Sequence, residues 1–294
     1  MLETLVARLE AVLRQAANAF EVILVNDGSQ DGSWAKTVEL AAGRPWLRGV
    51  NLMRNYGQHN ALLCGIKAAR YEVVVTIDDD LQNPPEEIPK LLAKLAEGHD
   101  VVYGTPEREE HGLWRNVASH VTKLALQNFM GADTARSVSA FRVFRTQIRE
   151  AFAYYQGPFV SIDVLLTWGT SRFSALRVRS DPRPVGSSNY TFAMLVRHAL
   201  NMVTGFSVLP LQLASLMGFG FTIFGIFVLT FVVGRYLLEG TPVPGFPFLA
   251  SIIAIFSGAQ LFGLGVLGEY LARMHSRTMG KPSYAVREDT KQPE

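Results

Sequence analysis

The sequence predicts an α/β domain with a mostly parallel sheet, followed by an amphipathic segment and a hairpin of two membrane-spanning helices. Short β-rich runs alternate with helical segments through residues 1–180, and such alternation is typical of parallel sheets with helices on their faces. The last third of the chain contains two long apolar runs without charged side chains. With 48% hydrophobic and 18% charged residues among 294, the chain is too apolar and too weakly charged for disorder.

The charge and the cysteine content exclude several classes of protein. The formal net charge is +2, so the chain lacks the basic excess of a nucleic-acid-binding protein, and we expect no nucleic-acid partner. The single cysteine, Cys64, excludes an intrachain disulfide framework and a zinc site built from cysteines. Cys64 lies in a helical apolar stretch and is expected in the core.

Four strands are expected in the first domain, separated by helical stretches. The β-rich runs cover residues 20–25, 49–53, 72–77 and 100–104. The helical stretches between them include residues 34–42, 60–69 and 85–97. Ligands of such folds bind beyond the carboxyl ends of the strands. The first three runs lead directly into the polar motifs NDGSQDGS, RNYGQHN and DDDLQNPP, which are therefore candidate ligand-binding loops.

The most informative motif for chemistry is the run Asp78-Asp79-Asp80-Leu81-Gln82, which contains candidate metal ligands. Three carboxylates at the end of an apolar strand repel one another, which is costly unless a cation neutralises them. If strand geometry persists, residues 78 and 80 point to the same side. Asp78, Asp80 and Gln82 then offer oxygens to Mg²⁺ or Mn²⁺. The alternative is a solvated acidic turn before a helix that begins at a proline, and the motif alone leaves both interpretations open.

The other two loops allow a binding and a structural interpretation. Asp27 follows the first strand and can accept a hydrogen bond from a base or ribose, but Asp-Gly is also a common turn. The RNYGQHN loop precedes a helix whose first amides can face a phosphate. Asn60 in that loop can equally serve as the N-cap of the helix.

The two apolar runs are long enough to cross a membrane. They cover residues 208–233 and 246–267, and a helix needs about 20 apolar residues to cross the hydrocarbon core. The connection at 234–245 is short, so the two helices form an antiparallel hairpin, and their glycines fit close packing between spans or subunits. The alternative is a pair of buried core helices in a soluble protein.

Basic residues flank the outer ends of the hairpin and place both termini in the cytoplasm. The N-terminus lacks the uninterrupted apolar stretch of a signal peptide. Residues 191–206 have a strong apolar face and suit a helix lying in the membrane interface, or an ordinary amphipathic helix packed on the first domain.

Together and in order, these motifs resemble family 2 glycosyltransferases with the GT-A fold. The likeness is greatest to the polyprenyl-phosphate glycosyltransferases, which include dolichol-phosphate mannosyltransferase and bacterial undecaprenyl-phosphate sugar transferases. It rests on NDGSQDGS, RNYGQHNAL, DDDLQNPPEEIP, RPVGSSNY and GAQLFGLGVLGEY and covers almost the whole chain. The resemblance implies a metal-dependent, inverting transfer of a sugar from a nucleotide-sugar to a polyprenyl phosphate, for a cell-envelope glycan or lipid.

The resemblance also assigns roles to residues. Asp78, Asp80 and Gln82 hold the divalent metal, and Asp27, Gly28, Asn55 and Asp79 bind the donor. Arg115, Lys123, Arg183 and Asn189 receive the lipid phosphate, and the catalytic residues are Asp80, Arg115 and Arg183. Asn189 replaces a lysine common in relatives, and ARSVSAFR at 135–142 lacks their usual acidic residue, so the sugar and the nucleotide stay open.

The expected organisation follows from these roles. A cytoplasmic catalytic domain covers residues 1–186, an interfacial segment 187–207, the two spans with their loop 208–271, and a cytoplasmic tail 272–294. We expect a multi-pass protein of the inner membrane and a homo-oligomer, for which family likeness suggests a tetramer. Asp163 can line a cleft or lie on a helix surface, and we expect a carboxylate on a helix surface.

One departure from the family concerns the first strand. Relatives begin with a strand and turn of the kind VSVVIPVYNE, whereas this sequence begins in the helix that follows it. The resemblance implies that this strand, a central one, and part of the nucleoside pocket are missing. A start assigned too far downstream or a truncated form would explain this.

Two other functions compete with this interpretation. A processive polysaccharide synthase also uses a metal-binding GT-A site, but its Q-x-x-R-W motif is absent from the sequence. A truncated, non-catalytic membrane scaffold that keeps the GT-A fold is the alternative from a different class, and the complete 78–82 motif opposes it.

Overall fold

The computed structural model describes residues 1–106, 137–157, 160–181, 209–239 and 245–291. The chain divides into two compact units. The first contains Met1–Ala199 and Gly280–Glu294, and the second contains Leu200–Met279. The interfacial segment expected at 187–207 lies outside the described residues.

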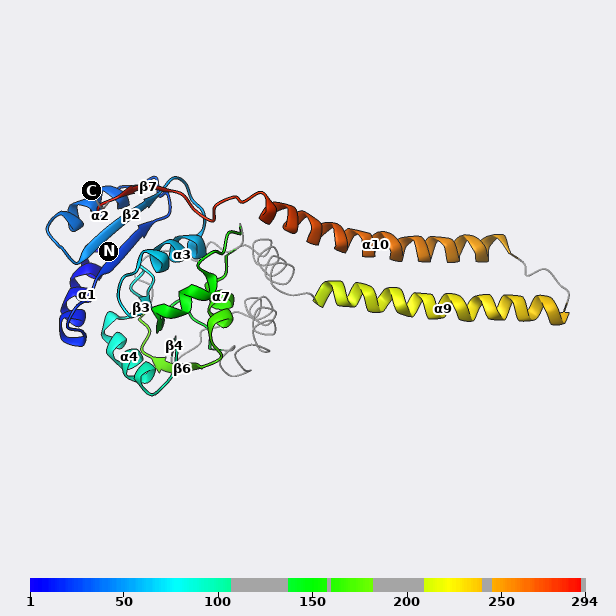
Figure 1. The fold of residues 1–294 in the computed structure, drawn as a ribbon, viewed down its shortest axis with the longest axis horizontal. Coiled ribbons are helices and arrows are strands. Elements are labelled where there is room, and N and C mark those ends of the chain that lie inside the picture. Colours follow the sequence, from blue (N-terminus) through cyan, green and yellow to red (C-terminus); the bar gives the residue numbers. More distant parts are fainter. Residues whose placement is uncertain (107–136, 158–159, 182–208, 240–244, 292–294) are drawn as a thin grey trace. The chain divides into compact units, whose positions relative to one another are not determined.

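The first unit is built from alternating helices and strands (Figure 1). Its strands are β1 (Val22–Asn26), β2 (Leu47–Leu52), β3 (Val73–Thr76), β4 (Val101–Pro106), β5 (Arg142–Arg145), β6 (Phe173–Val178) and β7 (Val286–Asp289). Its α-helices are α1 (Leu2–Ala16), α2 (Ser33–Ala42), α3 (Gln58–Ala68), α4 (Ile88–Ala96) and α7 (Ile162–Gly169). Two 3₁₀ helices are η1 (Pro85–Glu87) and η2 (Thr146–Phe152). All four strands predicted from the sequence are present, each within two residues of its expected position.

The described strands form two sheets, in the orders β1-β2-β7 and β3-β5-β4-β6. The prediction of a mostly parallel sheet is wrong. Among the described strands, β1–β2 and β4–β6 pair in parallel, whereas β2–β7, β3–β5 and β4–β5 are antiparallel. Helix α2 supplies the crossover that the parallel pair β1–β2 requires, but β7 reaches β2 from a distant part of the chain and is free of that constraint.

Helices cover both faces of the second sheet. Val102 of β4 packs in a cluster with Leu5 and Leu9 of α1 and with residues of α4. Its neighbours Val101 and Tyr103 instead pack with α3, η2 and α7. Successive side chains of a strand point to opposite faces, so these are the two sides of the sheet. The apolar residues Leu5 and Leu9, four positions apart on one side of α1, therefore place this helix on the face of the sheet to which Val102 points.

The last strand, β7, lies in the segment that the sequence analysis expected to be a tail. The guanidinium of Arg48 in β2 donates to the carboxylate of Asp289, from Nε to Oδ1 at 3.0 Å and to Oδ2 at 3.2 Å, and from Nη2 to Oδ2 at 2.5 Å. The N–H of Gly49 donates to the hydroxyl of Thr290 at 2.9 Å, and the indole of Trp34 donates to Glu288 at 2.9 Å. The chain after the hairpin is thus part of the first unit.

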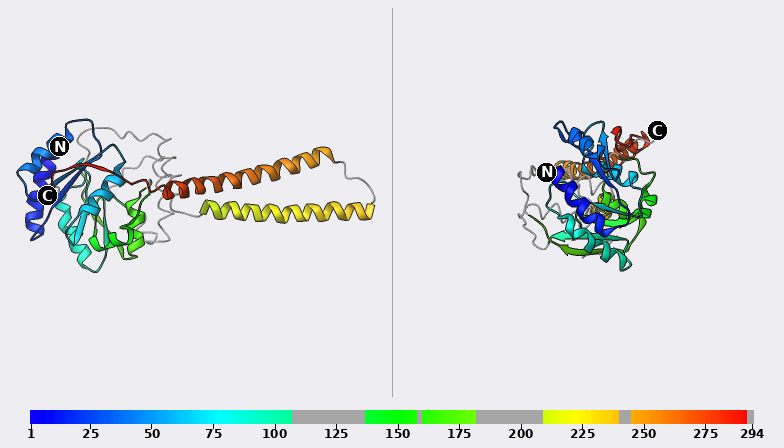
Figure 2. Two further views of the ribbon diagram at one scale, coloured as in Figure 1. Left: turned by 45° about the horizontal axis from the view of Figure 1, so that its top comes forward. Right: turned by 90° about the vertical axis from the view of Figure 1, so that its left-hand side faces the viewer.

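The second unit contains the helices α9 (Leu209–Glu239) and α10 (Phe246–Thr278), which lie side by side in Figures 1 and 2. The spans Pro210–Leu238 and Ile255–Thr278 are long and apolar enough to cross a membrane, with mean hydropathies of 2.4 and 1.2. None of the most apolar window of either span is buried. That exposure argues against core helices of a soluble protein.

Glycine allows close packing of the hairpin at one described position. The ring of Phe256 lies 5.8 Å from that of Phe221, and a Cβ added to Gly225 would stand 3.2 Å from Phe256. At the other glycines of these helices an added Cβ would meet nothing within 4 Å; these are Gly218, Gly220, Gly234, Gly258, Gly263, Gly265 and Gly268. The expected packing between spans therefore holds at Gly225.

We expect Asp289→Asn to loosen β7 from the sheet. The guanidinium of Arg48 holds the pKa of Asp289 below its ordinary value, and both side chains are largely buried. Losing this charge-assisted pair should cost about 1–2 kcal/mol, or a few degrees in the midpoint of thermal unfolding. Because the pKa in the folded state is lowered, the contribution of the pair is present above about pH 4 and is lost as the pH falls through that lowered pKa.

The matched control is Arg14→Ala, which removes an exposed pair with Glu10 in α1 and should leave the midpoint nearly unchanged. Equal midpoints for Asp289→Asn and the unmodified protein at pH 7 would show that the pair does not hold β7.

Candidate active site

The loops after β1, β2 and β3 are joined by side-chain hydrogen bonds. Asp27, directly after β1, accepts the N–H of Tyr56 through Oδ1 at 2.7 Å and the N–H of Gly57 through Oδ2 at 2.8 Å. Gln58, the first residue of α3, donates from Nε2 to Oδ1 of Asp78 at 2.8 Å. The carboxyl ends of the three strands therefore meet at one edge, where the polar motifs were predicted to gather.

Gly28 allows two of these loops to approach closely. Its φ is +68°, a conformation that side chains with a Cβ rarely adopt. A Cβ at this position would stand 2.5 Å from the backbone carbon of Arg54 and 2.6 Å from the amide nitrogen of Asn55. Asp27 and Gly28 therefore hold the loops after β1 and β2 together, Asp27 through hydrogen bonds and Gly28 through close backbone packing.

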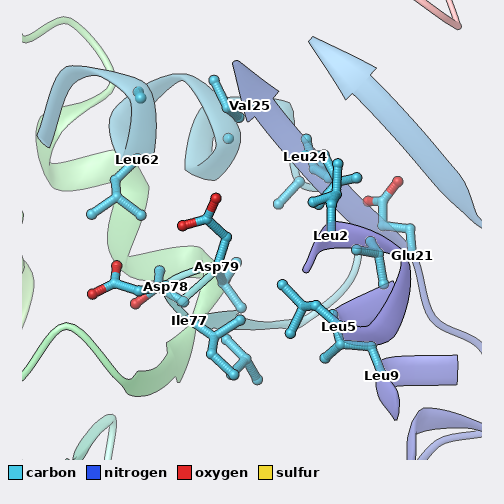
Figure 3. Close-up of a pocket in the computed structure, with 18 of the residues that line it drawn as sticks. Leu2, Leu5, Leu9, Glu21, Leu24, Val25, Leu62, Ile77, Asp78 and Asp79 are labelled. Carbon is cyan, nitrogen blue, oxygen red and sulfur yellow. The ribbon is translucent and has the colours of Figure 1, made fainter. Parts of the chain in front are cut away.

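A cavity of about 1680 Å³ opens at this edge (Figure 3). Asp27, Asn55, Asp78, Asp79 and Asp80 all line it. In Figure 3 the carboxylate of Asp79 points into the cavity beside Asp78. The structure thus brings together five of the seven residues predicted to bind the donor and the metal. Gly28 and Gln82 are not among the residues that line the cavity, and Gly28 packs against the Arg54–Asn55 backbone.

The three carboxylates lie in a turn and not on a continued strand. Strand β3 ends at Thr76, so the alternation that would have pointed residues 78 and 80 to one side does not apply. Asp80 accepts the N–H of Gln82 at 3.1 Å, and Leu81 between them has a φ of +61°. A non-glycine residue in this region is uncommon and costs energy, so the turn is held in its shape by its surroundings.

Burial raises the pKa of Asp78, and the charge of Asp80 raises it further. The hydrogen bond from Gln58 acts in the opposite direction. Crowded, partly buried carboxylates of this kind are stabilised by a cation. The part of the chain that the structure describes holds no group of three His, Cys, Asp or Glu side chains placed to bind a metal by themselves. The oxygens of Asp78 and Asp80 are of the kind that Mg²⁺ prefers, and Mg²⁺ usually completes its shell with water and substrate oxygens.

Four predicted residues fall outside the described part of the chain. Arg115 and Lys123 belong to residues 107–136, and Arg183 and Asn189 belong to residues 182–208. The predicted site for the acceptor phosphate therefore stays a prediction.

Comparison with known proteins identifies the family. The model of "Glycosyl transferase family 2" matches residues 2–157. A protein of Pseudomonas paraeruginosa named undecaprenyl-phosphate 4-deoxy-4-formamido-L-arabinose transferase is 36% identical over 97% of this chain and 85% of its own. This chain belongs to glycosyl transferase family 2. A protein of the same name from Shewanella sediminis is 33% identical over 98% of this chain and 88% of its own.

Solved structures are more distant from this glycosyltransferase. Glucosyl-3-phosphoglycerate synthase from Mycobacterium tuberculosis is 17% identical and matches with a TM-score of 0.49, over 69% of this chain and 74% of that chain. A likeness at this level carries no argument about the site. The family match confirms the predicted glycosyltransferase, with its GT-A-like α/β domain and two apolar C-terminal helices, and these features indicate a membrane protein.

A buried polar network in this glycosyltransferase was not predicted from the sequence. Asp163 of α7 is only 8% exposed, so its prediction as a surface carboxylate is wrong. It forms an ion pair with Arg142 of β5, which is 2% exposed, and it accepts the hydroxyl of Tyr103 at 3.0 Å. Burial, together with the charge of Asp163, raises the pKa of Tyr103 well above its ordinary value. The sequence contained one indication of this burial, because Asp163 stands between apolar neighbours in IDVLL.

Other isolated predictions can be placed as well. Cys64 is buried in the core as expected, and burial raises the pKa of its thiol to about 11. Nearby in α3, Nδ1 of His59 accepts the N–H of Ile162 at 3.3 Å and so links α3 to α7. Asn60 is not the N-cap of α3, because the helix begins at Gln58 and its N-cap is Gly57.

We expect Gly28→Ala to separate the loops after β1 and β2. The unfavourable φ and the overlap with the Arg54–Asn55 backbone should together cost about 1–3 kcal/mol. The variant should unfold at a lower temperature and bind nucleotide more weakly, as measured by differential scanning fluorimetry and isothermal titration calorimetry. Gly43→Ala is the control, because an added Cβ there meets nothing within 4 Å and φ is −102°. If both variants match the unmodified protein, the close approach at Gly28 is not required.

We expect Asp163→Asn to destabilise the first unit far more than Tyr103→Phe. The first substitution leaves the buried guanidinium of Arg142 without its counter-charge, at a cost of about 3–5 kcal/mol. The second removes one hydrogen bond from an otherwise intact pair and should cost about 1 kcal/mol. Thermal unfolding of the two variants in detergent provides the comparison, and equal losses would contradict a charge-balanced network.

Proposed function

We propose that this glycosyltransferase moves one sugar from a nucleotide-sugar to undecaprenyl phosphate, or a related polyprenyl phosphate, for modification of the cell envelope. The observation that carries the proposal is the 36% identity over 97% of the chain to a protein with an undecaprenyl-phosphate sugar transferase name. The carboxylate-lined cavity and the two long apolar helices support it. By the same likeness, 4-deoxy-4-formamido-L-arabinose is the first sugar to test.

The donor half of the site lies at the carboxyl edge of β1 to β3. Both carboxylate oxygens of Asp27 already accept backbone N–H groups, but each keeps a lone pair for a hydroxyl or base N–H of the nucleoside. Asn55 and Asp79 line the same cavity, and Gly28 keeps the two loops close enough to form its wall.

Asp78, Asp80 and Gln82 would hold a divalent metal, Mg²⁺ or Mn²⁺, together with the diphosphate of the donor. When bound, the metal neutralises charge that develops on the leaving nucleoside diphosphate. The protein contributes the preset turn at Leu81 and the hydrogen bond from Gln58 that orients Asp78. Asp80 is the proposed catalytic carboxylate of this set.

The acceptor half of the site would consist of Arg115, Lys123, Arg183 and Asn189. A polyprenyl phosphate carries nearly two negative charges at pH 7, because its second pKa is about 6. Such an acceptor is already nucleophilic and needs cationic positioning more than a general base. Arg115 and Arg183 therefore complete the proposed catalytic set. Attack in line with the leaving group would invert the anomeric carbon.

The cellular arrangement belongs to the same proposal. Residues 1–186 form the catalytic domain, 187–207 an interfacial segment, 208–271 the membrane hairpin and 272–294 the remaining cytoplasmic residues. Basic residues outside the hairpin favour cytoplasmic termini and a cytoplasmic catalytic domain at the inner membrane. We also propose that the protein is a homo-oligomer, for which family likeness suggests a tetramer.

The test uses detergent-purified protein with Mn²⁺, undecaprenyl phosphate and radiolabelled nucleotide-sugars. The set includes UDP-, GDP- and dTDP-linked sugars and a nucleotide-linked 4-deoxy-4-formamido-L-arabinose. We expect label in the lipid phase, and Asp80→Asn should reduce it by about a hundredfold or more, because a lost metal ligand weakens charge neutralisation on the leaving group. Glu97→Gln, which changes an exposed carboxylate at the end of α4, should retain full activity.

Metal binding in the presence of UDP, followed by electron paramagnetic resonance of Mn²⁺, separates the enzyme from a scaffold. A catalytic site predicts a nucleotide-dependent Mn²⁺ signal that Asp80→Asn weakens. Absence of both the signal and the lipid product, with every donor in the set, would contradict the transferase proposal and support the non-catalytic alternative.

A further inference from the structure

The segment that follows the hairpin holds the start of the loop after β2. Strand β7 lies beside β2 (Figure 1), and directly after β2 the backbone N–H of Met53 donates to the carbonyl oxygen of Ala285 at 2.9 Å. The carbonyl oxygen of Met53 accepts a hydrogen bond from Nη2 of Arg287, also at 2.9 Å. Both backbone polar groups of Met53 are therefore bound by residues 285–287.

This loop, residues 53–57 and hereafter the β2 loop, also forms part of the wall of the candidate active site. Asn55 and Gly57 line the cavity, and the N–H of Gly57 donates to Asp27 at 2.8 Å. Asn55 follows Met53 by only two residues, so a change in the direction in which the chain leaves β2 moves Asn55 with it. The contacts of Met53 therefore influence the shape of the cavity.

A β-bulge on β7 directs Arg287 toward the β2 loop. Asn51 of β2 pairs with Glu288, whereas the next residue of β2 pairs with Val286. Arg287 is therefore the extra residue of the bulge. A bulge bends its strand locally and redirects a side chain, and bulges are common next to active sites. The irregular pairing thus gives Arg287 a direction in which its guanidinium reaches the backbone beyond the end of β2.

The residues ahead of β7 are fixed to the first unit. The hydroxyl of Ser283, a residue that is 7% exposed, donates to the carbonyl oxygen of Gly157 at 3.0 Å. Tyr284 and Tyr56 of the β2 loop pack against the same buried cluster of residues from β2 and α3. Residues 283–287 therefore provide a fixed support against which the β2 loop is held.

A row of polar side chains also connects β7 to the end of β1. Nδ2 of Asn51 donates to Oε1 of Glu288 at 3.5 Å, and Nδ2 of Asn26 donates to Oδ1 of Asn51 at 2.8 Å. Asn26 and Asn51 are only 9% and 6% exposed, so water competes little for their hydrogen bond. Asn26 directly precedes Asp27, and β7 therefore contacts the supports of the loops after both β1 and β2.

We propose that Arg287 is a positioning residue for nucleotide binding: by holding the carbonyl group of Met53, it sets where the β2 loop places the wall of the cavity. The inference rests on the proposed function, which assigns the nucleotide-sugar to this cavity. Arg287 is not among the residues that line the cavity, so it acts through the loop and not by contact with the nucleotide. A guanidinium suits this role, because a charged donor forms a stronger hydrogen bond than a neutral one.

The test compares the full-length protein in detergent with three variants. Arg287→Ala removes the hydrogen bond to Met53, and Arg287→Lys keeps a cationic donor at the same position. Lys291→Ala is the matched control, because Lys291 donates to the carbonyl oxygen of Pro45, ahead of the start of β2 and so at the end far from the β2 loop. The side chain of Arg287 is exposed, so both of its variants should fold.

Amide hydrogen exchange, measured by mass spectrometry without nucleotide, metal or lipid, reports the β2 loop directly and does not depend on transferase activity. We expect Arg287→Ala to speed exchange in this loop by about threefold to tenfold, the effect of losing one charge-assisted hydrogen bond. Arg287→Lys should restore most of the protection, and amides of β4, inside the second sheet, serve as the internal reference. Unchanged exchange with Arg287→Ala, or an equal increase with Lys291→Ala, would overturn the proposal.

Isothermal titration calorimetry with UDP, GDP and dTDP, and with the nucleoside of whichever nucleotide binds, measures the consequence for the site. We expect Arg287→Ala to weaken nucleotide and nucleoside by the same factor, about threefold to tenfold, with an unchanged midpoint of thermal unfolding.

A loss confined to the nucleotide would mean that the guanidinium acts on the phosphates directly, and an unchanged affinity would mean that the loop position does not matter; either result contradicts the positioning role. If the unmodified protein binds none of the three nucleotides, the proposed function fails, whereas the exchange data still show whether Arg287 holds the β2 loop.

Discussion

Asp27 stands directly after β1 and accepts two backbone hydrogen bonds from the loop after β2. The N–H groups of Tyr56 and Gly57 precede helix α3 and have no partner within it, so the carboxylate satisfies donors that the helix start leaves open. With this loop fixed, Gln58 reaches Asp78 after β3. The Asp27 side chain thereby helps to set the relative positions of the ends of β1, β2 and β3. Gly28, which has no Cβ, allows the loops after β1 and β2 to approach closely.

The first unit contains two kinds of carboxylate, represented by Asp163 and Asp78, which differ in the side chains that contact them. Asp163 is balanced inside the protein by Arg142 and Tyr103, so its charge is fully used by the fold. Asp78 accepts a hydrogen bond from the neutral amide of Gln58, and a second carboxylate, Asp80, lies close enough to raise the pKa of Asp78. An internally balanced carboxylate suits a structural role, whereas two neighbouring carboxylates beside an open cavity suit the binding of a cation with its anionic substrate.

The sequence was sufficient where local pattern determines structure. Apolar runs ending in polar loops located the first four predicted strands, and the absence of charge over long runs located α9 and α10. Local pattern was insufficient for β7, whose sequence Val-Arg-Glu-Asp is polar and whose pairing depends on Arg48, far away in the chain. It also did not reveal that β3 ends before the aspartates, or that Asp163 is buried, because both depend on tertiary contacts with β5.

Because β7 follows α10 in the chain, the hairpin is an insertion within the sequence of the first unit. The chain leaves the first unit after β6, passes through α9 and α10, and rejoins the first unit at Gly280. A membrane anchor at the end of a chain can be removed without disturbing the domain before it. Here the residues after the hairpin supply a strand, an ion pair with Arg48 and a hydrogen bond to Gly49. Because β7 follows α10 in the chain, the sheet that contains β1, β2 and β7 can be completed only after the hairpin segment has been synthesised.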